Sequence, residues 1–126
     1  MEKISNPKIS FIQLGRSDYS YEAAESVVMK TAQHNMRFRI YAEASYNFSE
    51  LAHLYIQQNR FSEAKWYLLQ SNLISRQEND DRHTVLNLID LASIKTSIGD
   101  FVLALQDLKE AQDIACAKGL CEYLTT

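Results

Sequence analysis

Residues recur along this chain at a spacing of forty positions, and this recurrence constrains the fold more than any other feature. Ala24, Ala64 and Ala104 are forty residues apart. Three positions before each alanine is an aromatic residue, and four positions after it is a branched aliphatic residue: Tyr21, Phe61 and Phe101, then Val28, Leu68 and Leu108. A fixed period of roughly 20 to 50 residues is typical of repeat proteins, in which each unit buries its apolar face against its neighbours. The spacing therefore predicts a solenoid.

Within each unit the apolar residues recur at helical spacing. Between positions 36 and 58 they step by three or four residues, through Ile40, Ala44, Phe48, Leu51 and Tyr55. That step marks one face of an α-helix. The chain has 3 glycines and 1 proline, too few for a fold built on tight hairpins. We expect an all-α fold, a right-handed α-solenoid of three antiparallel helix pairs with a 40-residue period.

The repeats divide the chain into one domain, 1–126, with units at about 4–35, 36–78 and 79–118 and a terminal segment at 119–126. The first unit is the weakest, with a short helix predicted at 7–14 and a longer one at 19–33. Gly99 is expected to end a helix in the left-handed conformation, and Asp100 to cap the next one. The last helix should present polar residues outward, as a terminal repeat does: Gln106, Lys109, Glu110 and Asp113.

Charge and composition exclude several classes of function. The formal net charge is −3 and no basic cluster is present, which disfavours nucleic-acid binding. No apolar run approaches the ~18 residues of a membrane span, and no signal peptide is visible, so we expect a cytoplasmic protein without a membrane partner. Cys116 and Cys121 match no zinc motif by spacing and are expected to be free thiols. We predict no metal site and no cofactor.

The repeated residues resemble the tetratricopeptide repeat family. That family has a large residue, a Leu-small pair and an aromatic on the first helix, a Gly–acidic–aromatic turn, then Ala, a large residue and Ala on the second. The second unit matches with Phe48, Leu51-Ala52, Tyr55, Asn59-Arg60-Phe61, Ala64, Leu68 and Ser71. The third matches with Leu88, Leu91-Ala92, Lys95, Gly99-Asp100-Phe101, Ala104, Leu108 and Ala111. The period exceeds the family's usual length of about 34 residues, and Lys95 replaces an aromatic.

The resemblance implies a concave face, formed by the first helix of each pair, that binds a protein or peptide. Its residues here would be Tyr46, Ser49, Glu50, His53, Gln57, Leu86, Ile89, Asp90, Ser93 and Ser97. One subgroup of the family grips a peptide carboxylate with Lys, Asn and Arg at such positions. Acidic Glu50 and Asp90 occupy two of them here, whereas carboxylate recognition needs donors and positive charge. We expect neutral or basic partner segments, with a merely solvated groove as the alternative.

Catalysis is the less favoured interpretation. Glu50 and His53 are three residues apart on one helix face, as an acid–base pair could be. Catalysis would also need a nucleophile or metal in a closed pocket, and the spacing reveals neither. We therefore expect a non-catalytic interaction module. The alternative is a regulatory fragment of a larger signalling protein that senses a ligand or peptide.

A second candidate surface lies on the opposite side of the second unit. Taking 100° per residue, Trp66, Leu69 and Leu73 are turned roughly 140° to 200° away from Ala64, on the convex face. The third unit has Gln106, Lys109 and Asp113 there, so the repeat does not require apolar residues. Trp is a frequent interface anchor. We predict a partner surface or homodimer contact, unless the chain's own termini or a repeat seam covers the trio.

Overall fold

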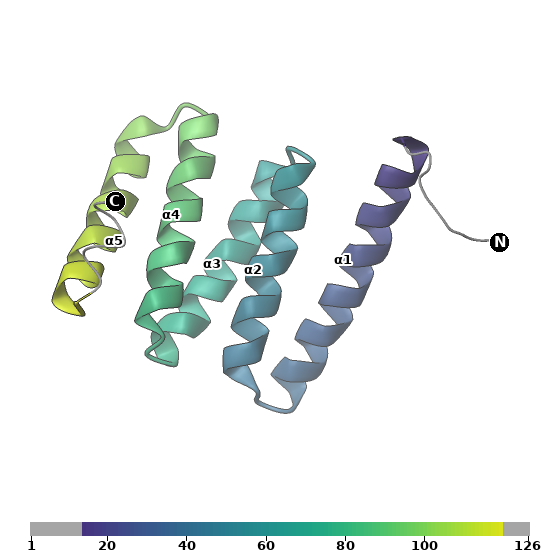
Figure 1. The fold of residues 1–126 in the computed structure, drawn as a ribbon, viewed down its shortest axis with the longest axis horizontal. Coiled ribbons are helices and arrows are strands. Elements are labelled where there is room, and N and C mark those ends of the chain that lie inside the picture. Colours follow the sequence, from purple (N-terminus) through teal and green to yellow (C-terminus); the bar gives the residue numbers. More distant parts are fainter. Residues whose placement is uncertain (1–13, 120–126) are drawn as a thin grey trace.

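The computed structural model describes residues 14–119, with side chains from 21 onward. This part of the chain forms five α-helices and no strand: α1 (Leu14–Arg37), α2 (Tyr41–Gln57), α3 (Phe61–Gln77), α4 (Asp81–Ser97) and α5 (Phe101–Ala117). Consecutive helices run in opposite directions, and each packs on the next along the chain (Figure 1). The all-α prediction is confirmed. The predicted helix at 7–14 falls outside the described residues except for Leu14, and the one predicted at 19–33 is part of the longer α1.

Three residues join each helix to the next, and the middle one is left-handed every time. Arg39, Asn59, Asn79 and Gly99 have φ values of 62°, 61°, 59° and 88°. After this residue the chain hydrogen-bonds back to the helix that it leaves, as at Asp100, whose amide N lies 2.7 Å from the Lys95 carbonyl O. A left-handed residue here lets the last carbonyls find donors while the chain reverses.

The predicted cap at Asp100 is wrong, because its side chain accepts no cap hydrogen bond. Asp80, which precedes α4 as Asp100 precedes α5, does cap its helix, with Oδ1 3.2 Å from the amide N of His83. The two aspartates precede different helices of the repeat, and their equivalents in the unit before are Ile40 and Arg60.

The core lies where neighbouring helices cross. It contains small and aliphatic residues from α2 to α5, among them Ala52, Ala64, Leu68, Leu91 and Ala111. Ala64 is 0% and Ala104 3% exposed, as predicted for crossings that only a small side chain allows.

Equivalent positions in two helix pairs make different contacts. Between α2 and α3, Tyr55 stacks on Tyr67 with ring centroids 5.6 Å apart. Forty residues later, between α4 and α5, the same two positions hold Lys95 and Asp107. Their Nζ and Oδ2 atoms are 2.6 Å apart, and the side chains are only 12% and 16% exposed. The lysine that departs from the family pattern is therefore half of a largely buried ion pair.

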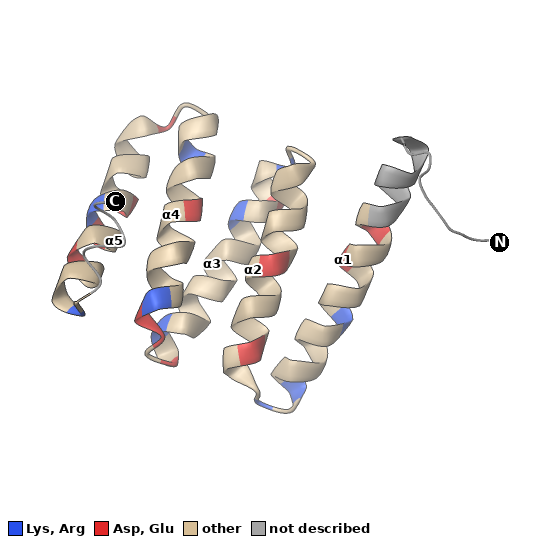
Figure 2. Ribbon diagram, in the orientation of Figure 1, with Lys and Arg blue, Asp and Glu red and all other residues tan. Residues whose placement is uncertain are grey.

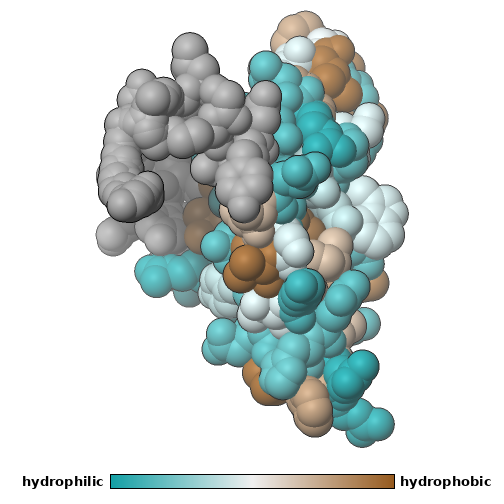
Figure 3. All heavy atoms as spheres, turned by 90° about the vertical axis from the view of Figure 1, so that its right-hand side faces the viewer, coloured by the Kyte–Doolittle hydropathy of each residue, from teal (hydrophilic) through white to brown (hydrophobic). Residues whose placement is uncertain are grey.

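The outer face of α5 corrects one expectation. The polar residues predicted there are indeed exposed, but so are Phe101, Leu105 and Leu108. Leu68, the equivalent of Leu108, is fully buried because α4 covers that side of α3. Within residues 14–119 no helix covers the same side of α5. Exposed apolar side chains also occur elsewhere, and Figure 3 shows several among hydrophilic ones in the view onto α1.

Cys116 is disulfide-bonded, so the expectation of a free thiol was wrong for this residue. It lies exposed in the last turn of α5. The second cysteine, Cys121, falls outside the described residues. None of the helices in the described range combines the length and apolar character that a membrane crossing requires.

Candidate functional site: a pocket between α2 and α4

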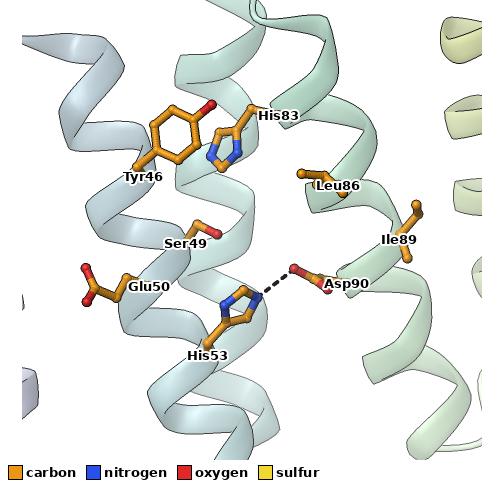
Figure 4. A pocket seen from close by; sticks show the side chains of 8 residues that line it. All are labelled: Tyr46, Ser49, Glu50, His53, His83, Leu86, Ile89 and Asp90. Atoms are coloured by element: carbon orange, nitrogen blue, oxygen red, sulfur yellow. Dashed lines mark hydrogen bonds and ion pairs between the residues drawn. The ribbon is translucent and has the colours of Figure 1, made fainter. Parts of the chain in front are cut away.

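A pocket of about 520 Å³ lies between α2 and α4 and is open to solvent. Each helix contributes four residues to its lining, Tyr46, Ser49, Glu50 and His53 from α2 and His83, Leu86, Ile89 and Asp90 from α4 (Figure 4). Steps of three and four residues put each set on one side of its helix. α3 lies behind α2 and α4 in the view of Figure 1. The volume falls within the range of roughly 300 to 1,000 Å³ that is usual for ligand sites.

Most of the predicted concave face meets in this pocket. Seven of the eight lining residues were predicted from the sequence, all but His83. The other three predicted residues, Gln57, Ser93 and Ser97, are exposed on the same two helices but do not line the pocket. His83 was not singled out from the sequence; it belongs to the first turn of α4 and is buried. That these residues bind a partner remains a prediction.

His53 and Asp90 join the two helices across the pocket. The imidazole Nε2 lies 2.7 Å from Oδ2 of Asp90 (Figure 4). This hydrogen bond raises the pKa of His53 above its ordinary value, although partial burial of the ring opposes the effect. Asp90 therefore favours the protonated imidazolium, and the pair is an ion pair whenever His53 carries its proton. The side chains are 50% and 32% exposed, so a ligand can reach both.

Tyr46 covers the other end of the pocket. Its ring stacks on the His83 imidazole with centroids 4.0 Å apart. Its hydroxyl donates to Oδ2 of Asp80 over 3.0 Å. Burial, followed by this hydrogen bond, raises the pKa of Tyr46 above its ordinary value, so the phenol stays neutral. One face of the ring is therefore occupied by the imidazole while the side chain as a whole remains half-exposed.

A buried polar network fixes the tautomer of His83. The Ser71 hydroxyl donates its single proton to the Ser45 carbonyl O over 2.7 Å. It therefore accepts from Asn87 Nδ2, 3.0 Å away, and from His83 Nε2, also 3.0 Å away. The proton of the neutral imidazole is thus on Nε2, and Nδ1 keeps a lone pair that has no partner among the described residues. Burial lowers the pKa of His83 below its ordinary value, which keeps the ring neutral.

The proximity of Ser71, His83 and Asp80 does not make a nucleophilic triad. The Ser71 side chain is 0% exposed, so no substrate can reach its hydroxyl. The Asp80 carboxylate binds the Tyr46 hydroxyl and the backbone amide of His83 rather than its imidazole. The network instead ties α2, α3 and α4 together, while Nδ1 of His83 and Oδ1 of Asn87 have no hydrogen-bond partner among the described residues. Within residues 14–119 no group of three or more His, Cys, Asp or Glu side chains could hold a metal ion.

The electrostatic surroundings of the pocket are acidic. α2 carries Glu43 and Glu50 and has no lysine or arginine, and α4 adds Asp90. Figure 2 shows acidic positions on α2 and both acidic and basic positions on α4. The positive charge of Arg82 acts on Tyr46, at the end of the pocket away from the His53–Asp90 pair. The excess negative charge therefore lies toward Asp90.

The second predicted surface is exposed. Trp66, Leu69 and Leu73 on α3 are 55%, 44% and 54% exposed. They therefore do not lie in a seam between helices, which removes one alternative. Trp66 makes an edge contact with Tyr67, ring centroids 5.1 Å apart, and this contact holds the indole at the surface. Whether the trio binds a partner or a second copy remains a prediction.

A comparison of the chain with protein-family models, with curated proteins and with solved structures gave no match.

Proposed function

We propose that this protein is a non-catalytic interaction module that binds a partner protein or peptide through the surfaces of its helical repeats. The observation that carries the proposal is the pocket between α2 and α4. It combines apolar side chains, an aromatic ring and hydrogen-bonding groups in one open concavity, as binding sites do. Its polar groups come from two helices whose relative position is set by the buried Ser71 network. Sites on rigid elements hold their geometry better than sites on loops.

The proposal includes a tetratricopeptide-like right-handed solenoid with a 40-residue period. Helix starts support it, because α2 and α4 begin at Tyr41 and Asp81, and α3 and α5 at Phe61 and Phe101. The left-handed residue between helices recurs at equivalent places. Repeats of this kind create extended concave surfaces, which suit an extended peptide. A cytoplasmic location is part of the same proposal, and the disulfide at Cys116 stands against it, because disulfides are rare in that compartment.

Leu86 and Ile89 supply the apolar contact in this proposal. Leu86 is 41% exposed and its side chain points into the pocket (Figure 4). Covering an exposed leucine with an apolar partner contributes up to about 1.5–3 kcal/mol. Tyr46 adds an aromatic surface at low entropic cost, because only two torsions are fixed. The partner segment should therefore carry at least one apolar residue.

Selection from a library of random peptides tests the proposal. Wild-type protein should enrich a peptide consensus, and Leu86→Glu should lose those peptides because it puts a carboxylate in the apolar part of the pocket. Leu108→Glu is the matched control, since Leu108 has nearly the same exposure, 42%, but lies on α5, outside both predicted partner surfaces. Peptides that bind Leu86→Glu as well as wild type would contradict the proposal.

The volume of the pocket also suits a small ligand. This supports the second candidate function, a regulatory fragment that senses a ligand or peptide. A panel of small metabolites screened by thermal shift distinguishes the two. A metabolite that stabilises wild type but not Leu86→Glu, with no peptide consensus, would favour the sensor. A homodimer through Trp66, Leu69 and Leu73 is compatible with either candidate, because that surface lies on another helix.

A further inference from the structure

We infer that the pocket between α2 and α4 recognises a cationic side chain, lysine or arginine, of the bound segment, with Asp90 as its charged partner. The inference rests on the proposed function and specifies which chemistry the site selects. Four features support it: the unpartnered acceptor of His83, the charge distribution, the apolar wall and the shared carboxylate of Asp90.

His83 offers an acceptor that nothing in the described chain satisfies. Its side chain is 3% exposed and lines the pocket, and its neutral ring keeps a lone pair on Nδ1. A buried acceptor without a donor is unfavourable, so a ligand that brings an N–H group gains from filling it. The ring lies between α2 and α4 beside Tyr46 (Figure 4). Nδ1 is closed to solvent in this structure, so a donor reaches it when neighbouring side chains move aside on binding.

The charges around the pocket favour a cation. Glu43, Glu50, Asp80 and Asp90 are acidic, and Arg82 is the basic side chain whose charge acts on Tyr46. Glu50 lines the pocket edge with its carboxylate turned away from α4 in Figure 4. It therefore adds to the field without occupying the space beside Asp90.

The apolar wall suits the methylene stem of a lysine or arginine. Such side chains place their stems along apolar surface while the charged head reaches a polar group. Leu86 points into the pocket from α4, between the Tyr46 end and the His53–Asp90 pair (Figure 4). The face of Tyr46 that does not stack on His83 can also attract a cation.

The carboxylate of Asp90 would be shared between His53 and the bound cation, so binding should depend on the protonation of His53. In the unliganded protein its Oδ2 bonds His53 Nε2. A guanidinium that takes over this carboxylate competes with the imidazolium for it. Glu50 on α2 and His83 on α4 also act electrostatically around this pair. Binding of a cation should therefore release a proton from His53, and affinity should fall as the solution becomes more acidic.

Three acetylated and amidated pentapeptides test the inference, Ala-Leu-Arg-Leu-Ala and its versions with citrulline or glutamate in place of arginine. Citrulline keeps the shape of arginine and removes its charge. Binding is followed by amide chemical shifts in NMR titrations. The arginine peptide should bind wild type about fivefold more tightly than the citrulline peptide, as expected for a partly exposed charged contact, and the glutamate peptide should bind least. The preference should shrink as pH falls through the pKa of His53.

Asp90→Asn should abolish the preference for arginine over citrulline, whereas the control Asp113→Asn, an exposed aspartate on α5, should keep it. Equal binding of arginine and citrulline peptides to wild type would overturn the inference, as would an unchanged preference in Asp90→Asn or no shifts from any of the three peptides. None of these results removes the proposed function, which depends on the peptide selection with Leu86→Glu. Thermal melts of each variant establish that it is folded.

Discussion

The ion pair between Lys95 and Asp107 should be replaceable by the aromatic pair that occupies the equivalent positions between α2 and α3. Lys95→Tyr alone leaves the carboxylate of Asp107 unpaired, and its side chain is only 16% exposed. Asp107→Tyr alone leaves the ammonium group of Lys95 unpaired, and its side chain is only 12% exposed. The double variant recreates the aromatic pair that Tyr55 and Tyr67 form at the equivalent positions, with parallel rings 5.6 Å apart. We expect both single variants to be destabilised and the double variant to recover most of the loss.

The magnitudes follow from burial. Breaking a fully buried ion pair costs about 3–5 kcal/mol, because the remaining charge is desolvated without compensation. Lys95 and Asp107 keep slight exposure, so we expect roughly 2 kcal/mol for each single variant. Replacing a whole buried pair by packed apolar residues is often neutral or stabilising, and an aromatic pair adds about 0.5–1.5 kcal/mol. The double variant should lie within about 1 kcal/mol of wild type, which gives a coupling energy of roughly 3 kcal/mol.

Urea unfolding of wild type, the two single variants and the double variant measures this coupling as a double-mutant cycle. A single change at the exposed pair of Lys118 and Asp81, such as Lys118→Gln, is the control and should leave the midpoint unchanged. If the double variant loses the sum of the single losses, the two positions do not act as one contact and the equivalence between the helix pairs is refuted.

Three further predictions concern packing, protonation and association. Ala104→Leu should lose about 1–3 kcal/mol by overpacking a helix crossing, and an unchanged thermal midpoint would show that the crossing is not tight. Burial lowers the pKa of His83, so only the unfolded chain takes up its proton as pH falls below about 6.5, and stability should decrease there. Asp90 raises the pKa of His53, so the stability from that pair is complete below about 6.5 and is lost as pH rises through the folded-state pKa. Urea unfolding of wild type, His83→Gln and His53→Gln across this pH range measures how the free energy of unfolding depends on pH. A variant whose pH dependence is identical to that of wild type would contradict the prediction for its histidine. Sedimentation should show self-association of wild type that Trp66→Ala with Leu73→Ser removes, and a wild type that stays monomeric at high concentration would exclude the homodimer.

Much of the fold could be predicted because it depends on local periodicity. Steps of three and four residues define each helix, and small residues such as Ala64 and Ala104 mark where helices cross. The left-handed turns were partly predictable, since Gly99 and Asn59 are residues that tolerate this conformation. Arg39, the middle residue of the first turn, gives no such signal, because arginine rarely adopts the left-handed conformation. Only the recurrence of the turn along the chain reveals its conformation.

The pocket could be predicted in outline from the resemblance, because residues three and four apart on two aligned helices share a face. His83 could not, since its burial depends on Ser71, a residue twelve positions earlier on another helix. The exposure of Leu108 was missed for a related reason. Its equivalent Leu68 is buried by the next helix, α4. The sequence pattern within a helix does not reveal whether another helix packs on its outer side.

Chemical-shift mapping with the peptide selected by wild-type protein locates the binding site on the helices. We expect the largest amide shifts within 46–53 of α2 and 83–90 of α4, and we expect Leu86→Glu to abolish them while Leu108→Glu does not. The largest shifts within 62–73 of α3 or 101–108 of α5, with no change along the pocket, would contradict the claim that this pocket is the binding site.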